Sequence, residues 1–202
     1  MRGTGEWRRD LKEFGAKNRQ LIWLLGLFLA GVEIGCLVFR GASGPLGQVL
    51  APLLALPSPV DGMGDAVRSM IGSCGPALLL LLILFLAGFS ACGAPLALAV
   101  PPFFGMGVGL SEAYYYARLT DGVRYVALFY MPHALLILIA LLIGCSGAVK
   151  MSVQLCRQLL PRKSIGGDLW REVKMYAARF LLAAGLIFAA GAVDAVLRLL
   201  FL

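Results

Sequence analysis

Residues 125–149 read YVALFYMPHALLILIALLIGCSGAV, a stretch that contains no Asp, Glu, Lys or Arg. A helix rises about 1.5 Å per residue, so roughly 20 residues cross the hydrocarbon core of a bilayer, which is about 30 Å thick. A helix also satisfies its own backbone hydrogen bonds, which lipid cannot do for it. The stretch therefore predicts a transmembrane helix.

Similar apolar stretches lie on both sides of this one. They cover residues 21–39, 75–92, 96–115 and 180–201. Transmembrane β-strands would alternate apolar and polar residues, and the sequence has no such alternation. The sequence thus predicts an all-α, polytopic integral membrane helix bundle with about five transmembrane helices.

The composition agrees with lipid as the surrounding solvent. Hydrophobic residues make up 60% of the chain and the mean hydropathy is +0.85, whereas soluble domains average about 45–50% apolar residues. The net charge of +7 comes from basic residues that flank apolar stretches, so we expect membrane lipid and no nucleic acid as a partner. The five cysteines show no CxxC spacing, and neither a metal site nor a cofactor is expected.

The basic residues predict the orientation of the bundle. Residues 1–20 contain six Lys and Arg, residues 150–179 contain seven, and the other five of the 18 are spread over the opposite side. Five spans place both basic segments on one face, which the positive-inside rule makes cytoplasmic. We expect the N-terminus in the cytoplasm and the C-terminus outside.

This orientation divides the chain into four parts. They are a cytoplasmic basic segment (1–20), the first four spans (21–149), a cytoplasmic basic amphipathic segment (150–179) and the fifth span (180–202). Residues 41–74 are rich in Gly and Pro and are predicted to be an outer loop, in which Asp65 caps a short interfacial helix. Asp168 is the predicted N-cap of a helix that begins at Leu169 and leads into the fifth span.

Prolines mark irregular places in the predicted helices. A turn is expected at residues 93–95, and a polar loop at residues 111–124. Pro101 and Pro102 remove two backbone donors, so the third span should kink or break there. Pro132 should kink the start of the fourth span.

Three ionisable residues lie within or near the spans, namely Glu33, His133 and Asp194. Such residues are costly in hydrocarbon and usually face protein or water, so they could form a proton or ion path. Each also has a structural interpretation. Glu33 could lie near the outer interface, His133 could bind carbonyls freed by Pro132, and Asp194 could pair with Arg198 one turn later.

Glycines predict close contact between helices. Gly31 and Gly35 form one GxxxG pattern and Gly105 and Gly109 form another, and each gives a helix a flat face for helix packing or for a partner. The sequence shows no nucleophile motif and no metal-ligand spacing, so it predicts a protein that is not an enzyme.

The order of these features resembles the stage II sporulation protein M family of bacterial polytopic membrane proteins. The resemblance covers most of the chain. It includes residues 28–35 (FLAGVEIG), the Gly75-Pro76 start of the second hairpin, residues 103–109 (FFGMGVG) and the Met131-Pro132-His133 sequence that opens the fourth span. The family signature continues with Gly, Glu and Pro at places that hold Ala134, Ile137 and Ile139 here. A role that needs the glutamate of the family is therefore not carried over.

The resemblance implies a non-enzymatic membrane scaffold in a bacterial cytoplasmic membrane. Such a scaffold holds peptidoglycan-degrading sporulation proteins at the septum while the mother cell engulfs the forespore. The outer loop 41–74 and the loop between the third and fourth spans are the expected contacts. Two alternatives stay open: a small transporter or permease subunit with a site near Pro101, Pro102 and His133, and a packing module within another complex.

Overall fold

The computed structural model describes residues 19–41, 63–90, 93–119, 121–159 and 169–201. Nearly all of these residues lie in helices. The helices are α2 (Arg19–Gly41), α4 (Met63–Gly88), α5 (Gly93–Arg118), α6 (Gly122–Tyr125), the π-helical η1 (Val126–Tyr130), α7 (Met131–Leu159) and α8 (Leu169–Phe201).

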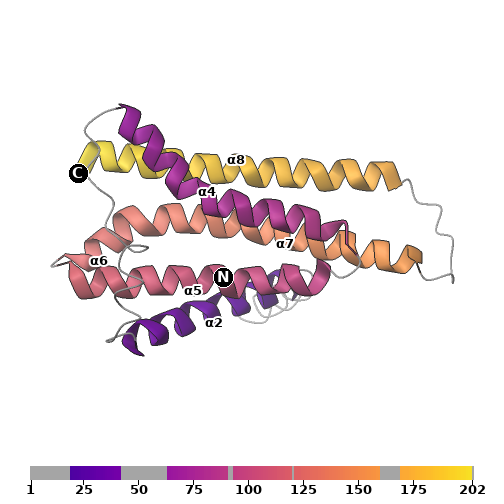
Figure 1. The fold of residues 1–202 in the computed structure, drawn as a ribbon, viewed down its shortest axis with the longest axis horizontal. Helices are drawn as coiled ribbons and strands as arrows, with labels where there is room; N and C mark the ends of the chain where they lie inside the picture. The colour runs from indigo at the N-terminus through magenta and orange to yellow at the C-terminus, as the bar shows by residue number, and fades with distance from the viewer. Residues whose placement is uncertain (1–18, 42–62, 91–92, 120, 160–168, 202) are drawn as a thin grey trace, which may run out of the picture.

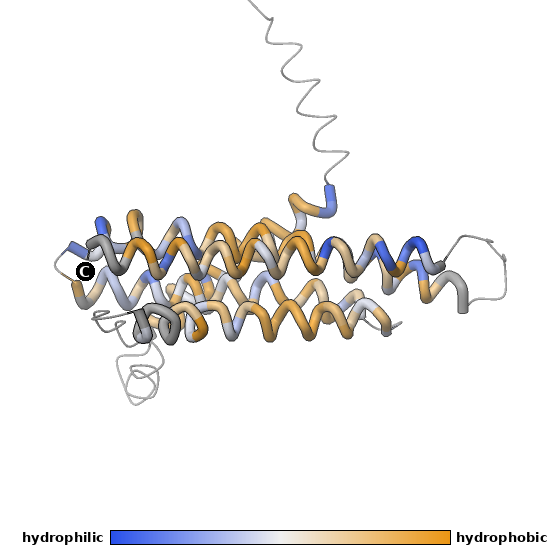
Figure 2. Tube along the Cα trace, turned by 90° about the horizontal axis from the view of Figure 1, so that it is seen from above, coloured by the Kyte–Doolittle hydropathy of each residue, from blue (hydrophilic) through white to orange (hydrophobic). Residues whose placement is uncertain are grey.

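Five of these helices are long and apolar enough to cross a membrane: α2, α4, α5, α7 and α8. Many of their large apolar side chains are exposed, as Leu181 is to 77%, and apolar residues predominate along the middle of the bundle in Figure 2. The predicted all-α polytopic bundle is confirmed, and the chain is a multi-pass membrane protein.

The five helices lie roughly side by side along one axis (Figure 1). We call the end with Arg19, the turn between α4 and α5, Leu159 and Leu169 the inner end, because the sequence predicts it to be cytoplasmic. The opposite end, with Gly41, Met63, α6 and the end of α8, is the outer end. At the inner end α7 and α8 extend beyond α2 (Figure 1).

The second span differs from its prediction at both ends. α4 begins at Met63, so the last part of the expected outer loop is helical and Asp65 lies inside the helix; residues 42–62 lie outside the described part of the chain. Gly75 and Pro76 do not start the helix, because the turn before them is held by α8: the buried Cys74 thiol donates to the Ile187 carbonyl at 3.3 Å. α4 ends at Gly88 and α5 already begins at Gly93, so the predicted turn at residues 93–95 lies inside α5.

The third span is one unbroken helix, so of the predicted kink or break at Pro101 and Pro102 the break is excluded. Neighbouring helices can support prolines inside a membrane span, and here Pro101 is fully buried while the backbone of Pro102 lies against α2. The helix also continues to Arg118, through much of the predicted loop 111–124.

The predicted cytoplasmic segment 150–179 is largely helical in its described part. α7 continues past Lys150 to Leu159, and α8 begins at Leu169 as predicted. Asp168 lies outside the described residues. The amphipathic start of α8 continues without a break into the fifth span. At residue 180 the polarity of the sequence changes, but the helix does not end.

The core is centred on α7, which contacts the other four long helices. Its Leu141 is fully buried together with Leu24 of α2, Leu84 of α4 and Ile187 of α8. At the inner end, the buried Ser152 of α7 donates to the Ser90 carbonyl at 2.9 Å and accepts from the Ala94 N–H at 3.2 Å. The Ser152 side chain thus links the turn between α4 and α5 to α7 by two hydrogen bonds.

Candidate functional site

The four predicted packing glycines lie in one interface between α2 and α5. A Cβ added at Gly31 would lie 2.7 Å from the Pro102 Cα, and one at Gly35 would lie 2.9 Å from the Leu110 nitrogen. From the other side, a Cβ at Gly105 would lie 3.1 Å from the Val32 nitrogen, and one at Gly109 would lie 3.0 Å from the Val32 Cα. The two GxxxG faces therefore interlock backbone to backbone.

The order of these contacts gives the direction of the two helices. Gly31 faces Pro102 and Gly35 faces Met106, so α2 and α5 run parallel. The Cys36 thiol, which donates to the Gly109 carbonyl at 3.4 Å, fits the same register. Parallel first and third spans are what the alternating topology requires.

Glu33 lies on the side of α2 that does not contact α5. Its side chain is exposed, as are Leu29 and Leu37 one turn away on either side. Among the described residues, no hydrogen bond or ion pair joins Glu33 to another helix. An ionisable group at the centre of a span costs about 2.5–3.5 kcal/mol on insertion scales. Glu33 lies just past the middle of α2, so this stripe of α2 is suited to a contact with another membrane protein.

His133 connects α7 to α8. Its Nδ1 lies 3.0 Å from the Ala190 carbonyl oxygen. Since a carbonyl can only accept, Nδ1 carries the hydrogen, and in the neutral ring Nε2 is left as an acceptor. The expectation that His133 binds carbonyls freed by Pro132 is therefore wrong. A π-helical turn, Val126–Tyr130, lies just before Pro132, and a local π turn is one of the adjustments by which membrane helices tolerate proline.

Asp194 lies one turn after Ala190 on α8 and is only 5% exposed. Its Oδ2 accepts a hydrogen bond from the Ser73 hydroxyl of α4 at 2.8 Å. The side chain of Arg198, its predicted partner, lies outside the described residues. Asp194 and His133 thus join α4, α7 and α8 at the outer end.

A cavity of about 360 Å³ opens beside this polar cluster. Its polar lining comes from Ser73, Ser111, Tyr130 and His133, and its wall on α5 includes Gly107. Sequence reasoning found His133 but missed the serines and Tyr130. Hydroxyl groups are inconspicuous in apolar helices, and helical spacing does not relate residues on different helices.

The described residues contain no group of three His, Cys, Asp or Glu side chains placed to hold a metal ion. The features that stand out are therefore the exposed Glu33 stripe (Leu29, Glu33 and Leu37) and the outer cavity with His133. In the comparisons with known proteins, no family model, no curated protein and no solved structure matches this chain.

Proposed function

We propose that the protein is a non-enzymatic scaffold of a bacterial cytoplasmic membrane, which positions peptidoglycan hydrolases during forespore engulfment. The observation that carries the proposal is the exposed Glu33 stripe. One face of α2 is fixed to the bundle through the glycine interface, and the other presents a carboxyl group between two leucines. A membrane anchor with a basic or hydrogen-bond donor side chain would remove the cost of this exposed group.

The sequence resemblance supplies the kind of partner. Enzymes that degrade the cell wall during engulfment are expected to be membrane-anchored proteins with a catalytic part outside. In the proposal, the Glu33 stripe binds their anchor, and the outer end of the bundle faces their catalytic part.

Photo-cross-linking in a sporulating culture tests this function. Leu37→p-benzoylphenylalanine places the probe on the stripe, and Leu181→p-benzoylphenylalanine places it on an exposed site of α8. We expect cross-links to peptidoglycan hydrolases from position 37 only, at least fivefold reduced by Glu33→Ala. Equal cross-linking yields from positions 37 and 181 would contradict the proposal. So would a yield from position 37 that Glu33→Ala does not change.

A second candidate function is that of a small permease subunit, and the outer cavity with His133 favours it. Gly107 separates the two functions, since it lines this cavity and a Cβ there has no atom within 4 Å. Gly107→Leu should fill the cavity without disturbing the bundle. Engulfment at the wild-type rate in this variant supports the scaffold, whereas loss of function with normal membrane levels supports the permease.

A further inference from the structure

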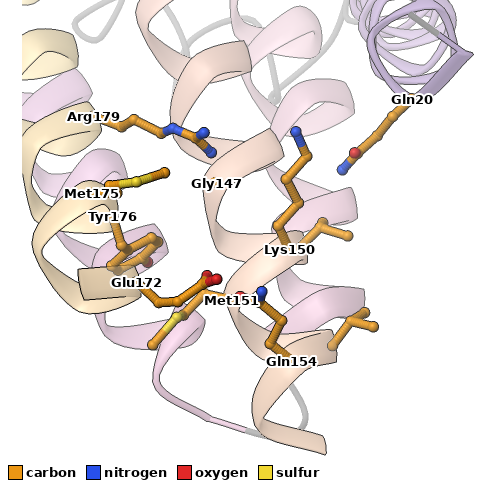
Figure 3. Close-up of a pocket in the computed structure, with 11 residues that line it drawn as sticks. Gln20, Gly147, Lys150, Met151, Gln154, Glu172, Met175, Tyr176 and Arg179 are labelled. Carbon is orange, nitrogen blue, oxygen red and sulfur yellow. The ribbon is translucent and has the colours of Figure 1, made fainter. Parts of the chain in front are cut away.

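The inner end has a second pocket, of about 490 Å³, between α7 and α8. Gln20, at the start of α2, closes one side of it. In Figure 3, Arg179 extends from α8 toward α7 near Gly147, whereas Lys150 lies on the side of α7 that faces Gln20, and the Gln20 amide points toward Lys150. The volume lies within the range of about 300–1,000 Å³ that is usual for small-molecule sites.

All three of these side chains offer hydrogen-bond donors that need an acceptor. The Gln20 Nε2 atom is buried and has no hydrogen-bond partner among the described residues. Lys150 and Arg179 form no ion pair within the described part of the chain. A buried amide donor without an acceptor is destabilising, and two cations that line the same pocket favour an anion with several oxygen atoms, such as a phosphate group.

The positions of the three residues place the pocket at the level of the lipid headgroups. Gln20 directly precedes the apolar stretch of α2, Lys150 directly follows that of α7, and Arg179 directly precedes that of α8. The pocket is thus lined by three residues that each lie where a polar segment changes to an apolar one. One turn deeper, Trp23 and Leu182 are exposed and could lie along acyl chains.

The solvent side of the pocket carries a different chemistry. Glu172 lies two turns before Arg179 on α8, and Gln154 lies one turn after Lys150 on α7. The Glu172 carboxylate disfavours a second anionic group there, but both side chains accept hydrogen bonds from hydroxyl groups. A headgroup with one phosphate and free hydroxyls, such as phosphoglycerol, matches both halves of the pocket.

We propose that this pocket binds the headgroup of an anionic phospholipid of the phosphatidylglycerol type from the inner leaflet, with Gln20, Lys150 and Arg179 around the phosphate. Basic pockets between membrane helices on the cytoplasmic side are a known form of lipid site. The proposal does not depend on the scaffold function, because lipid binding can be measured on the isolated protein.

Native mass spectrometry of the full chain in detergent, titrated with dimyristoyl phosphatidylglycerol, tests the proposal. We expect one tightly bound lipid, at least tenfold weaker binding to the Lys150→Gln/Arg179→Gln variant, and at least tenfold weaker binding of dimyristoyl phosphatidylcholine to the wild type. The matched control is Arg171→Gln/Lys174→Gln, which removes the same charge from the inner end outside the pocket and should change binding less than twofold.

Two further measurements distinguish a lipid site from a site for soluble anions and from a general effect of charge. Inorganic phosphate and glycerol 3-phosphate should not displace the lipid at equal concentration; displacement would identify a site for soluble anions and overturn the proposal.

Gln20→Leu should raise the midpoint of thermal unfolding without lipid and reduce the stabilisation that lipid gives. Equal effects of the pocket and control variants on lipid binding, or no difference between the two lipids, would also overturn it.

Discussion

At the residue scale, the hydrogen bond from Ser73 to Asp194 joins two spans inside the protein. We expect a double-mutant cycle of Ser73→Ala and Asp194→Ala to give a coupling energy between about 0.6 and 1.7 kcal/mol, the mean and the maximum for hydrogen bonds between membrane helices. The measurement is the free energy of unfolding of the purified protein in mixed micelles. A coupling energy near zero would mean that the bond does not stabilise the bundle.

Ser146→Ala provides the control for this cycle. Ser146 lies on α7 and is half-buried, like Ser73, but forms no hydrogen bond with Asp194 within the described residues. Effects of residues without shared partners add within about 0.3–0.5 kcal/mol. Ser146→Ala and Asp194→Ala should therefore be additive.

The sequence identified the unusual residues but not their partners. Glu33, His133 and Asp194 stand out because ionisable groups are rare in apolar stretches. Ser73 lies 121 positions before Asp194, and Ala190 lies 57 positions after His133. Helical periodicity relates residues within one helix, so no local pattern could join these pairs. The unpaired amide of Gln20 was missed for the same reason.

At the scale of the elements, the interface of α2 and α5 depends on the absence of side chains at four positions. Gly105→Ala would place a Cβ against the Phe28 and Val32 backbone, and backbone cannot move aside as a side chain can. We expect a loss of about 2 kcal/mol or more in the free energy of unfolding, in the upper part of the range for overpacking. Unfolding by denaturing detergent measures it.

Gly107→Ala is the matched control on the same helix. A Cβ at Gly107 has nothing within 4 Å, and alanine favours a helix by about 1 kcal/mol over glycine in water. This variant should be as stable as the wild type or slightly more stable. A similar loss in both variants would contradict the close-contact explanation, because a Cβ at Gly107 meets nothing and alanine favours the helix.

The helices themselves were largely predictable, and their ends were not. Long apolar stretches mark the spans because lipid accepts few other sequences. The errors fall at Pro76, Pro101 and Pro102, where proline suggested a start or a break. Neighbouring helices contact these places, as α8 does at Cys74 and α2 does at Pro102, and these contacts are set by the tertiary structure.

At the scale of the whole molecule, the predicted orientation can be tested with cysteine labelling. Cys156 is exposed at the inner end of α7, so in a Cys92→Ala background a membrane-impermeant maleimide should label it in inverted vesicles. Labelling in intact cells should be at least fivefold lower, because the reagent does not cross the membrane.

The opposite end provides the reciprocal measurement. Val123 is exposed on α6 at the outer end, and Val123→Cys in a Cys92→Ala/Cys156→Ala background should react in intact cells. The reverse pattern at both positions would invert the orientation and place the phosphatidylglycerol pocket in the other leaflet.

The number of spans and the alternation of their directions follow from the sequence, because hydropathy and chain connectivity determine them. Which helices pack against one another does not follow from the sequence. α2 packs mainly on α5, the helix after next, because the glycines at 31, 35, 105 and 109 fit one another. Two GxxxG patterns suggest close contact, but only the three-dimensional structure shows that each is the partner of the other.

The pairing of α2 with α5 also sets an order of events during synthesis at the ribosome. When α2 has entered the bilayer, its glycine face has no partner until α4 has been inserted and α5 has followed. During this interval the nascent chain holds an unassembled first helix, which the insertion machinery or a chaperone must keep from mispairing. A chain truncated before residue 93 would never leave this state, and membrane quality-control proteases should degrade it.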